Sequence, residues 1–287
     1  MKQYLVFFLL FTSVQTGFSQ KTDKHLQKKL AEMVGGFQGT LGIYVHDLSA
    51  NRVAALQADT VFPTASMVKL PILTGLMQKI DNGELQYHQV LTYKDSLLYA
   101  GEDILGSFKT GEKIELSKVL LLMLATSDNT ASLWLQSLAG TGTVINRLMD
   151  SLGLRDTRVN SRTPGRESNR LQYGWGQTTP REMAGLMEMI VNKQVISAAA
   201  SERMLRLLGR NYWDEQAISQ IPSDVFIASK NGAVDASRSE VLYVNGKKAR
   251  YIFCIATKNN SDTSWKSTNE AWELTRKISR FLWEYYQ

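Results

Sequence analysis

A serine and a lysine three residues apart are the best candidates in this chain for covalent chemistry. Ser66 and Lys69 form its only S-x-x-K sequence. Residues three apart on a helix share a face, so the hydroxyl and the amine would be within reach of each other. A serine hydroxyl is a weak nucleophile until a base takes its proton. The pair therefore predicts a serine nucleophile activated by a lysine.

The residues around this pair predict the start of a buried helix. Thr64 follows Pro63 and is a suitable N-cap, and most of the residues from 67 to 73 are apolar. Burial of Lys69 in such a run would favour its uncharged amine and lower its pKa from a reference of about 10.4. An uncharged amine is the form that a general base requires.

Two further polar clusters follow at longer spacing. Ser127-Asp128-Asn129 comes at the end of an apolar run, residues 116–125, which predicts a buried helix. Lys230-Asn231-Gly232-Ala233 follows the strand-like run 225–229. A lysine there can offer a cation to a substrate carboxylate, and a glycine lets the substrate approach the backbone. The alternative for the second cluster is an ordinary turn with a solvated lysine.

Composition and charge exclude several classes of function. The net charge is +6 and the sequence pI is about 9.2, but the charges are dispersed, so nucleic-acid binding is not expected. His25, His46 and His88 lack the spacing of zinc ligands, so no metal site is expected. Cys254, the single cysteine, lies in an apolar run and is expected to be a buried core residue without an internal disulfide.

The first 19 residues have the pattern of an export signal. Lys2 precedes the apolar run 4–14, and Gly17-Phe18-Ser19 supplies small residues at a cleavage site. The apolar run is too short for a transmembrane helix, although an N-terminal anchor is the alternative. We therefore expect an exported protein, periplasmic or secreted, without stable membrane insertion, whose residues 20–287 form one domain and act as a monomer.

The order of the predicted elements is strands, then helices, then strands and a last helix. Strand-like runs occur at 39–47, 52–56, 225–229, 240–244 and 251–257, and a C-terminal amphipathic helix is predicted over 267–286. Asn245-Gly246 is a typical hairpin turn between the last two strands. The polar stretch 163–179 reads as a long loop, and Thr179 and Pro180 begin the next helix. One sheet built from both ends of the chain, with a helical insertion, fits this order.

The order Ser66-x-x-Lys69, Ser127-Asp128-Asn129, Lys230-x-Gly232 resembles the penicillin-recognising serine hydrolases, and its spacing is similar to the class A β-lactamases. Thr178-Thr179-Pro180 also occurs where that class begins a helix after its omega loop. The resemblance implies an α/β (α+β) fold. It would have a five-stranded antiparallel sheet flanked by helices and an all-helical subdomain over roughly residues 60–205.

The resemblance also implies roles for individual residues. Ser66 would be acylated with Lys69 as its proton partner, and Ser127 would pass a proton to the leaving nitrogen. Asn129 would bind the substrate's side-chain amide, and Lys230 would serve the site for the substrate's carboxylate. No cofactor is implied, and the partner would be a small β-lactam.

Other residues are implied as parts of the substrate site. The backbone N–H groups of Ser66 and Ala233 would form an oxyanion hole, with Gly232 beside them. Arg238 would grip the substrate carboxylate, and Tyr99 would form a wall of the cleft. Asn231 stands where the family usually has threonine or serine, so hydrogen bonding to a carboxylate would differ in geometry there.

The residue that would release the acyl group is the main departure from the family pattern. Ungapped counting back from Pro180 places the position of the deacylating glutamate near Thr163, which is not acidic. Glu167 is the only carboxylate between Val159 and Pro180. It is either the deacylating base, if a gap compensates, or a loop residue paired with the arginines at 162, 166 or 170.

The role of Glu167 separates three functions. The first is a β-lactamase that hydrolyses its substrate through a Ser66 acyl-enzyme. The second is a related exported hydrolase of the D-alanyl-D-alanine peptidase type. The third is a protein that binds β-lactams through lasting acylation. Release of the acyl group requires a positioned base that activates water, so the place of Glu167 decides between them.

Overall fold

The computed structural model describes residues 20–99, 101 and 103–287. The predicted export signal, residues 1–19, lies outside these residues. Within the described part of the chain, none of the helices combines the length and apolar character needed to cross a bilayer.

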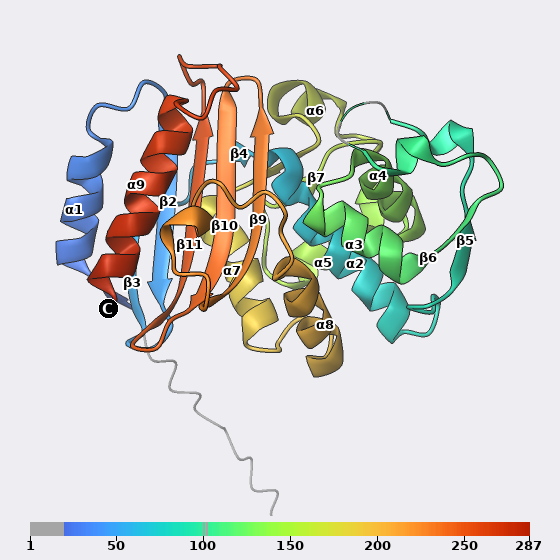
Figure 1. The fold of residues 1–287 in the computed structure, drawn as a ribbon, viewed down its shortest axis with the longest axis horizontal. Helices are drawn as coiled ribbons and strands as arrows, with labels where there is room; N and C mark the ends of the chain where they lie inside the picture. The colour runs from blue at the N-terminus through green and yellow to red at the C-terminus, as the bar shows by residue number, and fades with distance from the viewer. Residues whose placement is uncertain (1–19, 100, 102) are drawn as a thin grey trace, which may run out of the picture.

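One large sheet forms the left half of the molecule in Figure 1. In the described residues it has six strands in the order β1-β3-β2-β11-β10-β9. The strands are β1 (Lys21–Thr22), β2 (Thr40–Asp47), β3 (Arg52–Leu56), β9 (Phe226–Val234), β10 (Ser237–Asn245) and β11 (Arg250–Lys258). The five long strands pair antiparallel, which confirms the expected sheet, and the two-residue β1 adds a short parallel edge beside β3.

The two ends of the chain meet in the middle of this sheet. β2 pairs with β11, where Tyr44 lies opposite Cys254, and Cys254 is fully buried as expected. β2, β10 and β11 are buried along almost their whole length. β11 accordingly reads in the sequence as an apolar run, whereas the first half of β10, residues 237–240, is polar although it is buried. The turn at Asn245 joins β10 to β11 as predicted.

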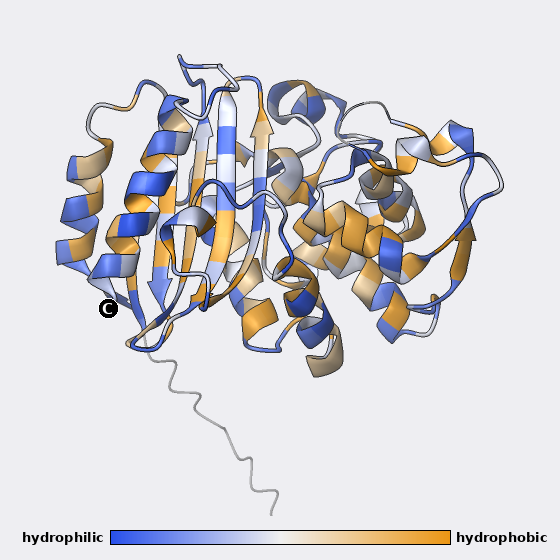
Figure 2. Ribbon diagram, in the orientation of Figure 1, coloured by the Kyte–Doolittle hydropathy of each residue, from blue (hydrophilic) through white to orange (hydrophobic). Residues whose placement is uncertain are grey.

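Helices cover both faces of the sheet. On one face lie α9 (Glu270–Tyr285), seen in front of the sheet in Figure 1, and α1 (Lys24–Val34), at the left edge of the same view. α7 (Pro180–Val191) packs against β2, β10 and β11 on the other face. α9 turns leucine and isoleucine side chains to the sheet, and its outer surface is hydrophilic in Figure 2. Burial of the apolar faces of these helices against the sheet stabilises this helix–sheet–helix arrangement.

The middle of the chain forms the helical half of the molecule. Its helices are α2 (Lys69–Asp81), α3 (Leu116–Ala125), α4 (Asn129–Leu138), α5 (Thr141–Ser151), α6 (Glu167–Tyr173) and α8 (Ala198–Leu208). Short strands lie between them, namely β4 (Phe62–Pro63), β5 (Val90–Thr92), β6 (Lys113–Glu115), β7 (Arg158–Val159) and β8 (Gly176–Thr178). α2 is buried on almost every side and contacts α4, α5 and α8, so it is the central helix of this half.

Local details differ from the sequence predictions at two places. The helix at Ser66 begins as a 3₁₀ turn, Ala65–Val68, and the Thr64 side chain caps nothing because Thr64 itself has helical backbone angles. The loop predicted over 163–179 contains α6 and β8. The N-cap prediction for Thr179 is confirmed, since its side chain accepts a hydrogen bond from the Glu182 N–H.

Candidate active site

Ser66 lies where the sheet meets the helical half. It occupies the 3₁₀ turn that precedes α2, and it lines a cleft of about 700 Å³. Ala65, just before it, has φ of +43°, a left-handed conformation that is uncommon for a residue other than glycine. Strain of this kind persists only where the surrounding packing holds it, and it often occurs at reactive residues. The backbone therefore presents Ser66 to the cleft at some conformational cost.

Lys69 brings the first two sequence motifs together. Its side chain is 0% exposed, and its Nζ lies 3.0 Å from Ser66 Oγ and 2.9 Å from Ser127 Oγ. The same nitrogen donates to the Ser127 carbonyl at 2.5 Å and to Asn129 Oδ1 at 3.0 Å. One buried nitrogen is thus in contact with both serine hydroxyls, which is the arrangement needed to move a proton between them.

The Ser127-Asp128-Asn129 segment owes its shape to the buried Asp128. Asp128 Oδ1 caps α4 by accepting from the Ala131 N–H, and Oδ2 accepts from the backbone N–H groups of Ile104 and Leu105. Ser127 has φ of +62°. The Asp128 carboxylate therefore joins the start of α4 to the loop that contains Ile104 and Leu105. It also stabilises the turn from which Ser127 and Asn129 contact Lys69. Sequence reasoning did not assign this role to Asp128.

β9 forms the opposite side of the site. Lys230-Asn231-Gly232-Ala233 lies within β9, where the sequence had suggested a segment following a strand. A Cβ on Gly232 would lie 2.7 Å from the Ser66 backbone nitrogen and 2.6 Å from the Thr64 carbonyl oxygen. Only glycine fits here, and its absence of a side chain lets β9 lie directly against the turn that carries Ser66.

The charged side chain of this segment is held close to its own strand. Lys230 is buried, and its Nζ donates to the Asn231 carbonyl at 2.9 Å and to Asn231 Oδ1 at 3.2 Å. Ala233 lies beside Ser66 in the lining of the cleft.

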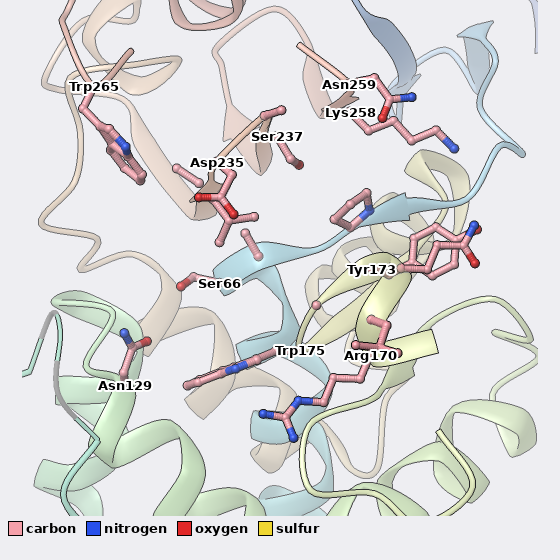
Figure 3. Close-up of a pocket in the computed structure, with 18 of the residues that line it drawn as sticks. Ser66, Asn129, Arg170, Tyr173, Trp175, Asp235, Ser237, Lys258, Asn259 and Trp265 are labelled. Atoms are coloured by element: carbon pink, nitrogen blue, oxygen red, sulfur yellow. The ribbon is translucent and has the colours of Figure 1, made fainter. Parts of the chain in front are cut away.

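Aromatic side chains shape the rest of the cleft. Tyr99 lines it and packs edge-to-face against Trp175, with ring centroids 4.9 Å apart. Figure 3 shows Ser66, Asn129 and Trp175 around the same opening, with Asp235 and Trp265 on its other side. No sequence pattern pointed to either tryptophan or to Asp235, because each depends on how separate loops fold over the site.

Arg238 is buried and binds the protein itself. Its guanidinium donates from Nη1 to the carbonyls of Asp235 and Ser237 at 2.9 Å and from Nη2 to the Ser264 carbonyl at 2.9 Å. Its Cζ lies 4.6 Å from the centroid of the Trp265 ring and 4.7 Å from that of Trp272. Arg238 thus joins the β9–β10 turn to the segment before α9, although it also lines a second cavity next to Ser66.

Glu167 does not lie with these residues. It is the first residue of α6, it is exposed, and its Oε1 accepts a hydrogen bond from the Gly165 N–H at 3.1 Å. It is absent from the described lining of the cleft, to which α6 contributes its last four residues, 170–173. No ion pair joins it to an arginine in the described residues, and Arg166 instead donates to Asn160 and Gln177.

The position predicted by ungapped counting is occupied by a neutral residue. Thr163 is buried and donates to the Ser161 carbonyl at 2.9 Å. Among the described residues that line the two cavities at Ser66, the carboxylates are Asp235, Glu215 and Glu240.

Comparison with known proteins agrees with this geometry. VEB-1, a β-lactamase from Pseudomonas aeruginosa, is 21% identical over 292 aligned positions, which cover 97% of this chain and 95% of that protein. A β-lactamase from Streptomyces fradiae is 27% identical over 212 residues, which cover 68% of this chain but only 65% of that protein.

A solved structure shows the same fold. It is a point mutant of PBP-A, described as an acyl-enzyme complex with penicillin G, which has a TM-score of 0.82 at 23% identity and covers 93% of this chain and 98% of its own. The sequence model of the β-lactamase enzyme family, Beta-lactamase2, matches residues 25–286. The chain therefore belongs to the β-lactamase enzyme family.

Proposed function

We propose that this protein is a serine hydrolase that β-lactams acylate at Ser66 and that it releases the acyl group slowly. Membership of the β-lactamase enzyme family supports a hydrolase that acts on β-lactam amides. The observation that carries the acylation step is the contact of one buried amine, Lys69 Nζ, with the hydroxyls of both Ser66 and Ser127.

The contacts of Lys69 support a complete acylation step. In its neutral form Nζ has one lone pair for the Ser66 proton, while its two N–H groups donate to oxygens of Ser127 and Asn129. Ser66 Oγ then attacks the lactam carbonyl, and the ring C–N bond breaks. The proton now on Lys69 reaches the leaving nitrogen through the Ser127 hydroxyl, so Lys69 returns to its neutral form.

The oxyanion formed in this step needs hydrogen-bond donors. The backbone N–H groups of Ser66 and Ala233 are the proposed pair, and the close approach of β9 at Gly232 supports this assignment. Donors of this kind are each worth about 3 kcal/mol of activation free energy. Lys230, Asn231 and Asn129 are the proposed polar contacts to the substrate, and Tyr99 is proposed to contact its side chain.

The placement of the carboxylates supports slow release. Deacylation needs a base that activates a water molecule beside the ester carbonyl. The exposed position of Glu167 supports a structural role in α6, and the buried residue at position 163 is a threonine. The proposal therefore favours hydrolysis limited by deacylation over rapid turnover.

Intact-mass measurement over time after mixing with penicillin G tests both halves of this proposal. We expect an adduct of the mass of the intact drug that forms quickly and decays slowly, and a burst followed by slow turnover with a chromogenic cephalosporin. Ser66→Ala should form no adduct. An adduct on that variant would remove Ser66 from its role, and steady turnover without a burst or adduct would contradict slow release.

The cellular location and assembly of the protein belong to the same proposal. An export signal over residues 1–19 would place the enzyme outside the cytoplasm, where β-lactams arrive first. N-terminal sequencing of the protein recovered from the periplasm or medium should begin near Gln20. Light scattering of the purified protein should give the mass of a single chain.

A further inference from the structure

A second cavity, of about 350 Å³, opens beside Ser66 on the side of β9. It shares Ser66 and Ala233 with the main cleft and reaches Ser127. Its other walls are β10, the loop around Trp213 and the segment that leads into α9. Asn231, one of the proposed contacts of a substrate carboxylate, also lines it.

This cavity is lined by a buried carboxyl group that the acylation step does not use. Glu240, on β10, is only 2% exposed. Its Oε2 accepts from the Ala217 N–H at 3.1 Å, whereas its Oε1 has no hydrogen-bond partner among the described residues. A buried polar atom without a partner is costly, so it usually meets a ligand or carries a proton.

Glu240 is a direct neighbour of the proposed carboxylate site. It lies opposite Asn231 in the antiparallel pair of β9 and β10. Residues opposite each other in such a pair project from the same face of the sheet with their Cβ atoms about 5 Å apart. A substrate carboxylate at Asn231 would therefore meet Glu240, and two ionised carboxylates at that distance repel each other.

We propose that Glu240 determines specificity on this side of the cleft by donating a hydrogen bond from its protonated carboxyl group to a carboxylate of the substrate. The inference rests on the proposed acylation of Ser66 by a carboxylate-bearing substrate. When Glu240 is ionised it repels that carboxylate, so recognition of anionic substrates weakens as the pH rises. Neutral acylating agents do not sense the change.

The charged and titratable groups around Glu240 fit this role. Burial raises the pKa of Glu240 to about 7, opposed by the Ala217 N–H and by Lys230 on β9, and reinforced by Glu215 in the loop. On β11, Cys254 lies opposite Val241 and so projects from the other face of the sheet; burial, assisted by Glu240, raises the pKa of its thiol. Arg238, two residues away on β10, donates to backbone carbonyls and not to Glu240. A substrate carboxylate would add a negative charge and favour protonated Glu240 further.

The experiment compares two acylating agents across pH. The second-order rate constant for Ser66 acylation is measured between pH 5.5 and 8.5 with penicillin G and with its uncharged methyl ester. Any ionisation of the Ser66–Lys69 pair affects the rate constants of both agents. The ratio of the constant for penicillin G to that for the methyl ester therefore reports only the effect of the substrate carboxylate. In the native protein we expect this ratio to fall by about tenfold between pH 6 and pH 8.

Two variants complete the test. Glu240→Gln keeps a hydrogen-bond donor but cannot ionise, so its ratio should be flat across pH and close to the low-pH value of the native protein. Glu215→Gln removes the exposed carboxylate of the same cavity but leaves Glu240 in place, so the ratio should still fall with pH, with its midpoint moved to a lower pH because Glu215 no longer raises the pKa of Glu240. Labelling of Ser66 by the methyl ester shows whether each variant is folded.

Each outcome has a distinct meaning. A flat ratio in the native protein overturns the role of Glu240 without reference to any variant. A Glu240→Gln ratio that still falls with pH overturns it as well. Failure of both agents to acylate Ser66 in the native protein would instead contradict the proposed function.

Discussion

Gly232 and the backbone nitrogen of Ser66 are so close that a Cβ on residue 232 would lie 2.7 Å from that nitrogen. Gly232→Ala should push β9 away from the turn that carries Ser66 and misplace the proposed oxyanion donors. We expect acylation by penicillin to slow by about 10²-fold, as for loss of one such donor. Stopped-flow acylation kinetics measure this, with Gly185→Ala, on α7 where a Cβ would meet nothing within 4 Å, as the control.

Lys69→Met should remove the proton carrier while keeping a long apolar stem in the buried site. We expect acylation to slow by about 10²- to 10⁴-fold, the usual contribution of a general base. The rate of adduct formation by mass spectrometry measures the effect, with circular dichroism to confirm folding. Acylation at the native rate would show that another group takes the Ser66 proton.

Glu167→Gln should leave deacylation within about twofold of the native rate, because Glu167 is exposed and outside the cleft lining. The decay of the penicillin adduct gives this rate directly. Accumulation of a long-lived adduct in the variant alone would instead identify Glu167 as the base and require α6 to move toward Ser66.

Arg238→Lys should destabilise the protein by about 2 kcal/mol, because a lysine cannot make the several carbonyl hydrogen bonds that the guanidinium makes between two indole rings. Urea unfolding measures the loss. Arg203, on the partly exposed helix α8, makes a cation–π contact with Tyr87 and serves as the matched control. Arg203→Lys should lower the free energy of unfolding by well under half as much. Equal losses of stability in the two variants would contradict the role of Arg238 in joining the β9–β10 turn to the segment before α9.

The buried carboxyl of Glu240 also predicts how stability depends on pH. Its pKa rises from an ordinary 4.5 to about 7, so the folded state holds this proton more tightly than the unfolded state. The resulting stabilisation is complete below pH 4.5 and is lost as the pH rises through 7. At 1.36 kcal/mol per pH unit, the loss is about 3 kcal/mol.

Glu240→Gln should remove this dependence. Its free energy of unfolding relative to the native protein should therefore rise between pH 5 and pH 8. Urea titrations at the two pH values measure the difference. If the substitution changed the free energy of unfolding equally at pH 5 and pH 8, Glu240 would have the same charge at both pH values.

The sequence predicted the contacts that depend on residues close together in the chain. Ser66 and Lys69 share one turn, so their contact follows from helix geometry, and Thr179 caps α7 as its type and the following Pro180 indicate. The apolar run before Ser127 likewise predicted α3. These features depend on residues one to four positions apart in the chain, so a sequence pattern can predict them.

Features set by tertiary packing were beyond the sequence. Arg238 was expected to grip a carboxylate, but two indole rings from the α9 side and four backbone carbonyls surround its guanidinium. Thr64 has the right type for an N-cap, yet its helical backbone angles rule out the capping geometry. Glu240 became a candidate only when the register placed it opposite Asn231.

The pairing of β2 with β11 has a consequence for the order of events during synthesis. The groove at Ser66 needs β9, which is held in the sheet through β10 and β11, and these strands leave the ribosome long after α2. A nascent chain that ends before β11 has Ser66 and Lys69 but lacks the strand that joins β9 and β10 to β2. The proposed acylation site is therefore expected to be complete only after β11 has been synthesised, and such long-range strand pairing makes assembly slow compared with that of a helical bundle.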